Sequence, residues 1–227
     1  MRTAVCRVLI GALVMLSPLA AGGAQADPSP SRASHHGQVF ILSGLMGELL
    51  SPGLEALADK IRRRGVPVAV SSHTTYGARA AEAAAEWSAG NRGAIVIIGH
   101  SLGAVSAMQM ARELKEKSIP VRLIVSMAPT TDLDVPGNVS SVVNYYQSNG
   151  VSKGKANRGA EFRGSIANVD LERSADVNHF NMVQRDRVHS ETMNRVFSLV
   201  SARKEPPTRS VQSSSATTGT AAWHDSN

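Results

Sequence analysis

One serine of this chain lies in a setting that could make it a nucleophile. The sequence around Ser101 reads Gly-His-Ser-Leu-Gly, so glycines stand at positions 99 and 103. The apolar, mostly β-branched run 94–98 predicts a strand buried on both faces, and 104–117 has the composition of a helix. A strand that turns sharply into a helix can lift a serine out of the sheet into a cleft. Glycines are needed there because the serine backbone is strained and neighbouring side chains would collide.

This segment resembles the nucleophile elbow of α/β-hydrolases, in the form common among lipases and thioesterases. The resemblance covers most of 39–202, although its specific motifs are short. It implies a base, an acid and an oxyanion hole, with the histidine base in the loop after the last strand. His179 has that position and is our predicted base. His189, at the start of the closing helix, is the alternative, and it fits a surface or packing role better. His100 lies inside the elbow and is expected to point away from Ser101.

The acid is where the sequence departs from the family pattern. The predicted strand 139–146 is followed by no carboxylate, and Met127-Ala128-Pro129 stands where some lipase-like relatives carry an Asp-Pro pair. We predict Asp132 as the acid and Asp170 as the second candidate. Each could instead be an exposed turn residue. A Ser–His pair oriented by a carbonyl or an asparagine is a further alternative. The remaining nearby carboxylates are those of Asp134 and Asp176.

Two backbone N–H groups are the expected oxyanion donors. The resemblance implies that one belongs to Leu102, the residue after the nucleophile. The other would come from the loop after the first strand, which reads Ser-Gly-Leu-Met-Gly from position 43. Its glycines let the amides turn inward, so Leu45 or Met46 is the predicted second donor.

Strands and helices alternate along the chain. This order predicts an α/β-hydrolase fold, a mostly parallel sheet flanked by helices on both faces, with the site at the carboxyl ends of the strands. No long insertion follows the strand 121–125, so the hydrolase would be compact with little or no cap. The predicted strands are 39–42, 67–71, 94–98, 121–125, 139–146 and 166–171, and the predicted helices are 52–64, 78–89, 104–117 and 188–202.

The ends of the chain look separate from this domain, which we place at 38–204. Residues 1–26 read as a signal peptide cut after Ala26, and 27–37 as a linker. The tail 205–227 is rich in Ser, Thr and Ala and is predicted to be disordered. The expected location is therefore secreted or periplasmic. The single cysteine, Cys6, lies in the leader, so disulfides and thiol catalysis are excluded from the mature chain.

Charge and motifs limit the partners. The 227 residues carry a net charge of +6, and the densest basic cluster, 62–64, ends a predicted helix, where cations complement the helix dipole. We therefore expect no nucleic-acid partner. No segment after the leader is long and apolar enough to span a membrane. No metal or nucleotide motif occurs, so no cofactor is expected. The oligomeric state is left open.

The combined prediction is a serine hydrolase that cleaves esters or thioesters of small-molecule or lipid-like substrates. Ser101 would attack the carbonyl, Leu102 and Leu45 or Met46 would hold the oxyanion, and His179 would move the proton. One alternative is a hydrolase-fold binding protein that has lost catalysis, which the missing standard acid favours. The other is an envelope acyltransferase, in which an alcohol replaces water as the acceptor.

Overall fold

The computed structural model describes residues 37–45 and 47–200, with the backbone alone for 47–51. The predicted signal peptide 1–26, all of the predicted linker except Gly37, the tail 205–227 and Met46 lie outside the described residues. None of the helices in the described ranges has both the length and the apolar character that a membrane span requires.

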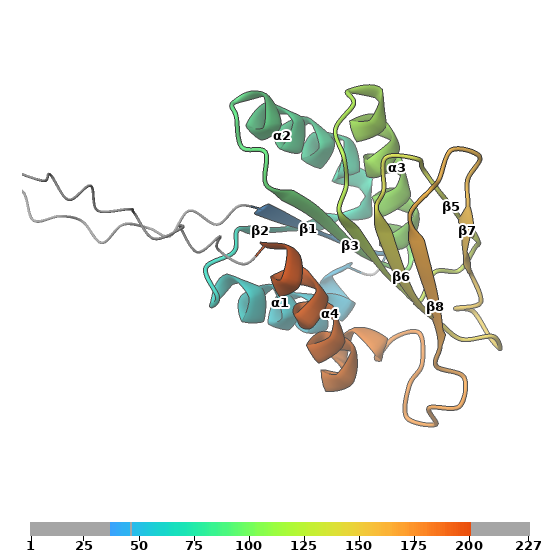
Figure 1. Cartoon of the computed structure of the whole chain (residues 1–227). Coiled ribbons are helices and arrows are strands. Elements are labelled where there is room, and N and C mark those ends of the chain that lie inside the picture. Colours follow the sequence, from blue (N-terminus) through green and yellow to red (C-terminus); the bar gives the residue numbers. More distant parts are fainter. Residues whose placement is uncertain (1–36, 46, 201–227) are drawn as a thin grey trace, which may run out of the picture. The chain divides into compact units, whose positions relative to one another are not determined.

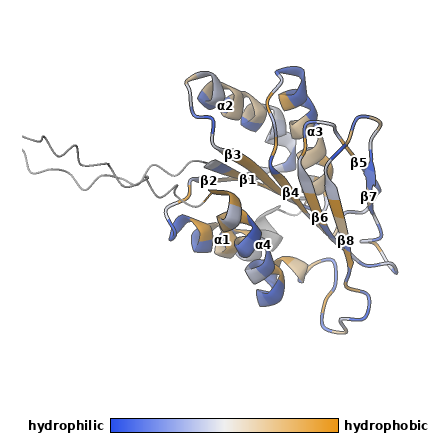
Figure 2. Cartoon of the chain, viewed as in Figure 1, coloured by the Kyte–Doolittle hydropathy of each residue, from blue (hydrophilic) through white to orange (hydrophobic). Residues whose placement is uncertain are grey.

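Six parallel strands form the central sheet, in the spatial order β2-β1-β3-β4-β6-β8. The inner strands are almost wholly apolar because both of their faces are buried. The hydropathy colouring shows this apolar layer between the helices (Figure 2). The strands are β1 (Gly37–Ser43), β2 (Val68–Ser72), β3 (Ala94–His100), β4 (Leu123–Met127), β6 (Ser141–Tyr146) and β8 (Ser165–Asp170).

Helices cover both faces of this sheet (Figure 1). On one face, α1 (Gly47–Arg62) and α4 (Asp186–Val200) pack with the apolar side chains of one core cluster. On the other face, α2 (Tyr76–Ser88) and α3 (Leu102–Glu116) pack with a second cluster. The predicted fold class, a mostly parallel sheet flanked by helices, is confirmed.

Two connections each contain a strand that was not predicted. The links from β4 to β6 and from β6 to β8 carry no helix; each instead contributes a three-residue strand, β5 (Leu133–Val135) and β7 (Ala156–Arg158). These two strands pair in parallel, and Leu133, Val135 and Ala156 extend the core cluster that α2 and α3 share. Strands this short leave no readable periodicity in the sequence, which is why both were missed.

Candidate active site

The turn between β3 and α3 holds Ser101 in a conformation that few non-glycine residues adopt, with φ 57° and ψ −121°. Neighbouring glycines make this turn possible. A Cβ on Gly99 would lie 2.3 Å from the carbonyl oxygen of Gly103, and a Cβ on Gly103 would lie 2.0 Å from the carbonyl oxygen of Leu42 in β1. The helix therefore packs directly on the strands at this point, and the serine is forced outward at the carboxyl end of β3.

Within the described residues, the Ser101 hydroxyl makes no hydrogen bond. Ser101 occupies the N-cap position of α3, but its side chain makes no capping hydrogen bond. The backbone N–H of Ser101 donates to the carbonyl of Met127, 2.9 Å away. Leu102, the first residue of α3, has an N–H group with no acceptor inside the helix. This donor stands beside the predicted nucleophile, at the positive end of the helix dipole.

The loop after β1 approaches the serine closely. A Cβ on Gly44 would lie 2.8 Å from Ser101 Cβ and 3.3 Å from its Oγ, so only glycine fits without a shift. Leu45 follows with its side chain 77% exposed. The structure thus brings Leu45 and Leu102 to Ser101, and Met46, the other predicted donor, lies outside the described residues.

His179 and Ser101 line the same cavity, which has a volume of about 270 Å³. Apolar side chains dominate its wall, among them those of Leu102 and the half-exposed Phe180. None of the described residues that line it is charged. Within the described residues no hydrogen bond joins the Ser101 hydroxyl to the imidazole. The two groups predicted as nucleophile and base therefore face one space that could hold an uncharged group of a ligand.

His100 fixes the backbone of the histidine loop. Its ring is fully buried, and its Nε2 donates a hydrogen bond to the carbonyl oxygen of His179 at 2.9 Å. The two rings lie 5.2 Å apart between centroids. Burial lowers the pKa of His100 to about 4, so the ring is neutral at physiological pH. Residue 100 of the elbow thus ties the predicted base to the strand that carries the nucleophile, a contact that we did not predict.

The imidazole of His179 has a hydroxyl partner. Its Nδ1 lies 2.9 Å from Oγ of Ser152, a buried residue in the loop between β6 and β7. Burial lowers the pKa of His179, which favours the neutral ring that a general base requires. Sequence reasoning missed Ser152 because a loop serine carries no signal of its own. Its place in the chain, just after β6, where the acid had been sought, could have marked it.

The two predicted acids have other partners. Asp132 is exposed and accepts hydrogen bonds from the Lys155 backbone N–H at 2.8 Å and the Asn157 side chain at 3.2 Å. These bonds hold the pKa of Asp132 below its usual value. Asp170 accepts from the N–H groups of Ser148 and Glu172. Among the residues that the structure describes, no carboxylate is hydrogen-bonded to His179. Asp132 and Asp170 instead hold loop backbone in place.

The other predicted alternatives are also accounted for. His189 is buried as a packing residue, with its Nε2 2.6 Å from the carbonyl of Val183 and its Nδ1 3.1 Å from Lys60 Nζ. Asp176 forms an ion pair with Arg185 at 3.2 Å. In the described ranges no group of three or more His, Cys, Asp or Glu side chains is arranged to hold a metal ion.

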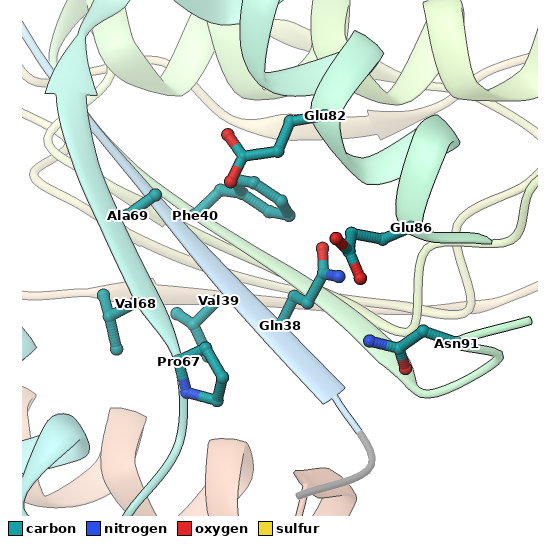
Figure 3. Close-up of a pocket in the computed structure, with 9 residues that line it drawn as sticks. All are labelled: Gln38, Val39, Phe40, Pro67, Val68, Ala69, Glu82, Glu86 and Asn91. Carbon is teal, nitrogen blue, oxygen red and sulfur yellow. The ribbon is translucent and has the colours of Figure 1, made fainter. Parts of the chain in front are cut away.

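A second cavity, of about 330 Å³, lies at the amino-terminal ends of β1 and β2 (Figure 3). Glu82 and Glu86 project into it from α2, and Gln38 projects from β1. Glu82 is ion-paired with Arg79. The described residues that line this cavity include neither a serine nor a histidine, so among them there is no counterpart to the pair formed by Ser101 and His179.

The parallel sheet, the strand–serine–helix elbow at its carboxyl edge and the histidine in the loop after the last strand are the arrangement of an α/β-hydrolase. No protein-family model matches the sequence, and comparison with curated proteins found no match.

Comparison with solved structures found matches of low similarity. An α/β-superfamily protein from Xanthomonas campestris is 18% identical, with 70% of this chain and 99% of that chain covered and a TM-score of 0.41. The RedJ thioesterase of the prodiginine biosynthetic pathway in Streptomyces coelicolor is 13% identical (78% and 91% covered, TM-score 0.41). Human thioesterase 2 is 11% identical (72% and 95% covered, TM-score 0.41). Similarity of this degree carries no information about substrate.

Proposed function

We propose that this protein is a serine hydrolase that cleaves esters or thioesters through an acyl-enzyme on Ser101. One observation carries the proposal. The Ser101 hydroxyl is presented on a strained elbow, makes no hydrogen bond within the described residues, and opens into the same cavity as the half-buried His179. A nucleophile needs such a neighbouring base, and a strained, unbonded serine serves no evident structural purpose.

The chemistry follows from these positions. Ser101 Oγ attacks the carbonyl carbon and gives its proton to Nε2 of His179, since Nδ1 is already bonded to Ser152. The carbonyl oxygen becomes an oxyanion and accepts hydrogen bonds from the N–H of Leu102 and from the Gly44–Leu45 loop. The proton passes to the departing alcohol or thiol as the carbon–oxygen or carbon–sulfur bond breaks. Water then attacks the acyl-enzyme with His179 as base and releases the acid.

The cavity wall indicates the kind of acyl group. Its described lining is mainly apolar and includes no charged side chain, so burying a charged acyl chain against these residues would carry an uncompensated desolvation cost. Leu45 and Phe180, 77% and 54% exposed, stand at the cavity and extend its apolar surface outward. These features support an uncharged, apolar acyl group as the substrate class.

Hydrolysis of p-nitrophenyl esters of increasing chain length tests the proposal. Ser101→Ala and His179→Ala should each reduce kcat/KM by about four orders of magnitude. Ser118→Ala is the matched control, because Ser118 is an exposed serine that shares the φ of 57° but lies outside the cavity. A fluorophosphonate probe should label the wild type at Ser101 and label Ser101→Ala not at all. A Ser101→Ala protein with wild-type turnover would refute the assignment.

A catalytically silent binding protein is the second candidate, and one observation favours it. No carboxylate within the described residues is hydrogen-bonded to His179, so the charge that normally supports the base is missing. Such a protein would bind an apolar acyl compound in the cavity without turnover. Folded wild-type protein that binds the ester yet never reacts with the fluorophosphonate would establish this function instead.

We also propose that the chain is exported and cleaved after Ala26. The charged start, apolar core and Ala-Gln-Ala ending of 1–26 support this. Expression of the full chain in a bacterial host, followed by mass spectrometry of the periplasmic fraction, should give a mature protein that begins at Asp27. An uncleaved protein confined to the cytosol would count against it.

A further inference from the structure

The hydroxyl that contacts His179 belongs to Ser152, in the loop that follows β6 at the carboxyl edge of the sheet. From the elbow strand β3 the sheet continues to β4 and then to β6, and the loop 147–155 follows β6 at the carboxyl edge. Within this loop, Ser152 is only 1% exposed, and its Oγ lies 2.9 Å from His179 Nδ1. This contact joins two loops, and the residues that make it are 27 positions apart in the chain.

We propose that Ser152 is the positioning residue that orients His179 as the base, in the role for which an acid was expected. This inference rests on the proposed hydrolase function. A carboxylate in that role accepts a hydrogen bond from Nδ1–H, fixes the tautomer that leaves Nε2 free, and stabilises the imidazolium. A serine hydroxyl can also accept from Nδ1–H, so it can hold the ring in place. It contributes no negative charge.

The backbone around Ser152 is held firmly enough for this role. The Ser152 carbonyl accepts a hydrogen bond from the Gln147 N–H at 2.9 Å. Two residues further along, the Gly154 carbonyl accepts a hydrogen bond from the buried Asn144 side chain. The Gly154 N–H donates to the Pro129 carbonyl. A Cβ on Gly154 would lie 2.0 Å from the Thr131 carbonyl oxygen, so the loop packs directly on the segment after β4. The hydroxyl is therefore presented from a fixed position.

A direct link also joins the two loops. The Gln147 side chain donates to the carbonyl of Val177, two residues before His179, at 2.9 Å. From the other side, His100 of β3 donates to the carbonyl of His179 itself. The imidazole is thus held through its backbone on two sides and through its ring by Ser152. Removal of the Ser152 hydroxyl should free the ring without releasing the loop.

The described carboxylates of the neighbouring segments have other partners. His100 is the titratable side chain that faces the ring from β3, and it is neutral. On the histidine loop, Asp176 is paired with Arg185. On the neighbouring loops, Asp170 and Glu172 accept hydrogen bonds from backbone N–H groups of 147–152. Ser152 alone makes a hydrogen bond to the His179 ring within the described residues.

The test measures the contact and the catalysis separately. The imidazole of His179 is titrated by NMR in the wild type and in Ser152→Ala, Ser152→Thr and Ser152→Asp, and the pH profile of kcat/KM is recorded for each. Ser126→Ala is the matched control, since the Ser126 hydroxyl of β4 is equally buried but has no hydrogen-bond partner in the described structure. Circular dichroism confirms that each variant is folded.

Ser152→Ala should lower kcat about tenfold with KM unchanged, the effect of one lost hydrogen bond in the transition state. Ser152→Thr should restore most of that loss, and Ser126→Ala should behave as the wild type. Ser152→Asp should raise the pKa of His179 by about 1 or more and move the acid limb of the profile upward by the same amount. If burial of the carboxylate prevents that variant from folding, the Ala and Thr variants still decide the question.

Two failures can be told apart. A folded, active protein in which Ser152→Ala changes neither kcat nor the titration of His179 would overturn this inference and leave the hydrolase function intact. A wild type that is never labelled at Ser101 would overturn the hydrolase function, and with it the role of Ser152 in catalysis. The NMR titration would then still report whether the hydroxyl sets the properties of the ring.

Discussion

The proposed nucleophile and its proposed base are held by two different kinds of structure. Ser101 is fixed by steric packing, because Gly99 and Gly103 allow backbone to lie against backbone where β3 meets α3. His179 is fixed by hydrogen bonds from side chains of other elements, namely His100 and Ser152. Steric packing of this kind requires particular residues at particular positions. Hydrogen bonds can be supplied by several residue types from several loops.

The comparison explains why one half of the site follows a sequence pattern and the other does not. A sequence motif can be recognised where only glycine fits, as at the elbow. On the histidine side, a hydroxyl stands where a carboxylate was expected, and both can accept a hydrogen bond from the ring. Four predictions, ordered from the largest expected effect to the smallest, test this contrast.

Gly103→Ala should be the most damaging of these substitutions. Its Cβ would meet the Leu42 carbonyl at 2.0 Å, so α3 must move away from β1. We expect activity to be lost and the free energy of unfolding to fall by about 3 kcal/mol. Gly77→Ala in α2 is the control, since its Cβ would meet only the Glu113 carboxylate at 3.4 Å. That substitution should stabilise the protein by about 0.5 kcal/mol. Urea denaturation measures both, and equal effects would contradict steric control of the elbow.

His100 should make stability depend on pH. The unfolded chain binds a proton at this residue below pH 6.5, whereas the folded protein resists it until about pH 4. The unfolded state therefore holds more protons in this window, and the free energy of unfolding should fall by about 3 kcal/mol as the pH drops through it. In His100→Leu this slope should be markedly smaller. The slope that remains belongs to His179 and His189, whose pKa values burial also lowers. An unchanged slope would show that His100 is not the group responsible.

The pH profile of the wild type should reflect a base without a charged partner. Because burial lowers the pKa of His179, kcat/KM should fall to half its plateau at a pH below 6.5 as the solution is acidified. The measurement is a kcat/KM titration with a p-nitrophenyl ester. A midpoint above pH 7 would point to a carboxylate that contacts the ring during catalysis and would refute the uncharged arrangement.

Asp132→Ala should have the smallest effect on catalysis. The carboxylate is exposed and bonds to Lys155 and Asn157 at the start of β7, so its loss should loosen that loop and slightly lower Tm. We expect kcat/KM to stay within about threefold of the wild type, as for an ordinary surface change. Asn157→Ala serves as the control, since it removes one of the same bonds from the other side. A loss of a hundredfold or more would restore Asp132 as the acid.

The main elements and the elbow could be predicted because they depend on local patterns. Buried parallel strands are continuous apolar runs, and α2, α3 and α4 lie within a few residues of their predicted ranges. The first helix begins five residues earlier than predicted, at Gly47, because we took Pro52 to mark its start. Ser152 has no sequence signal beyond its place after β6, because its contact with His179 depends on two loops that meet in space. For the same reason, the sequence around His100 does not indicate that its ring donates a hydrogen bond to the backbone carbonyl of His179.

The strained backbone of Ser101 also implies a conflict between protein stability and the proposed activity. A non-glycine residue at φ 57° and ψ −121° costs about 1–3 kcal/mol, which is a sizeable part of the margin by which a domain of this size stays folded. Glycine at this position would relieve the strain and remove the nucleophile. The most stable version of this fold is therefore expected to be inactive, and a search for stabilising substitutions without an activity screen would tend to find residue 101 first.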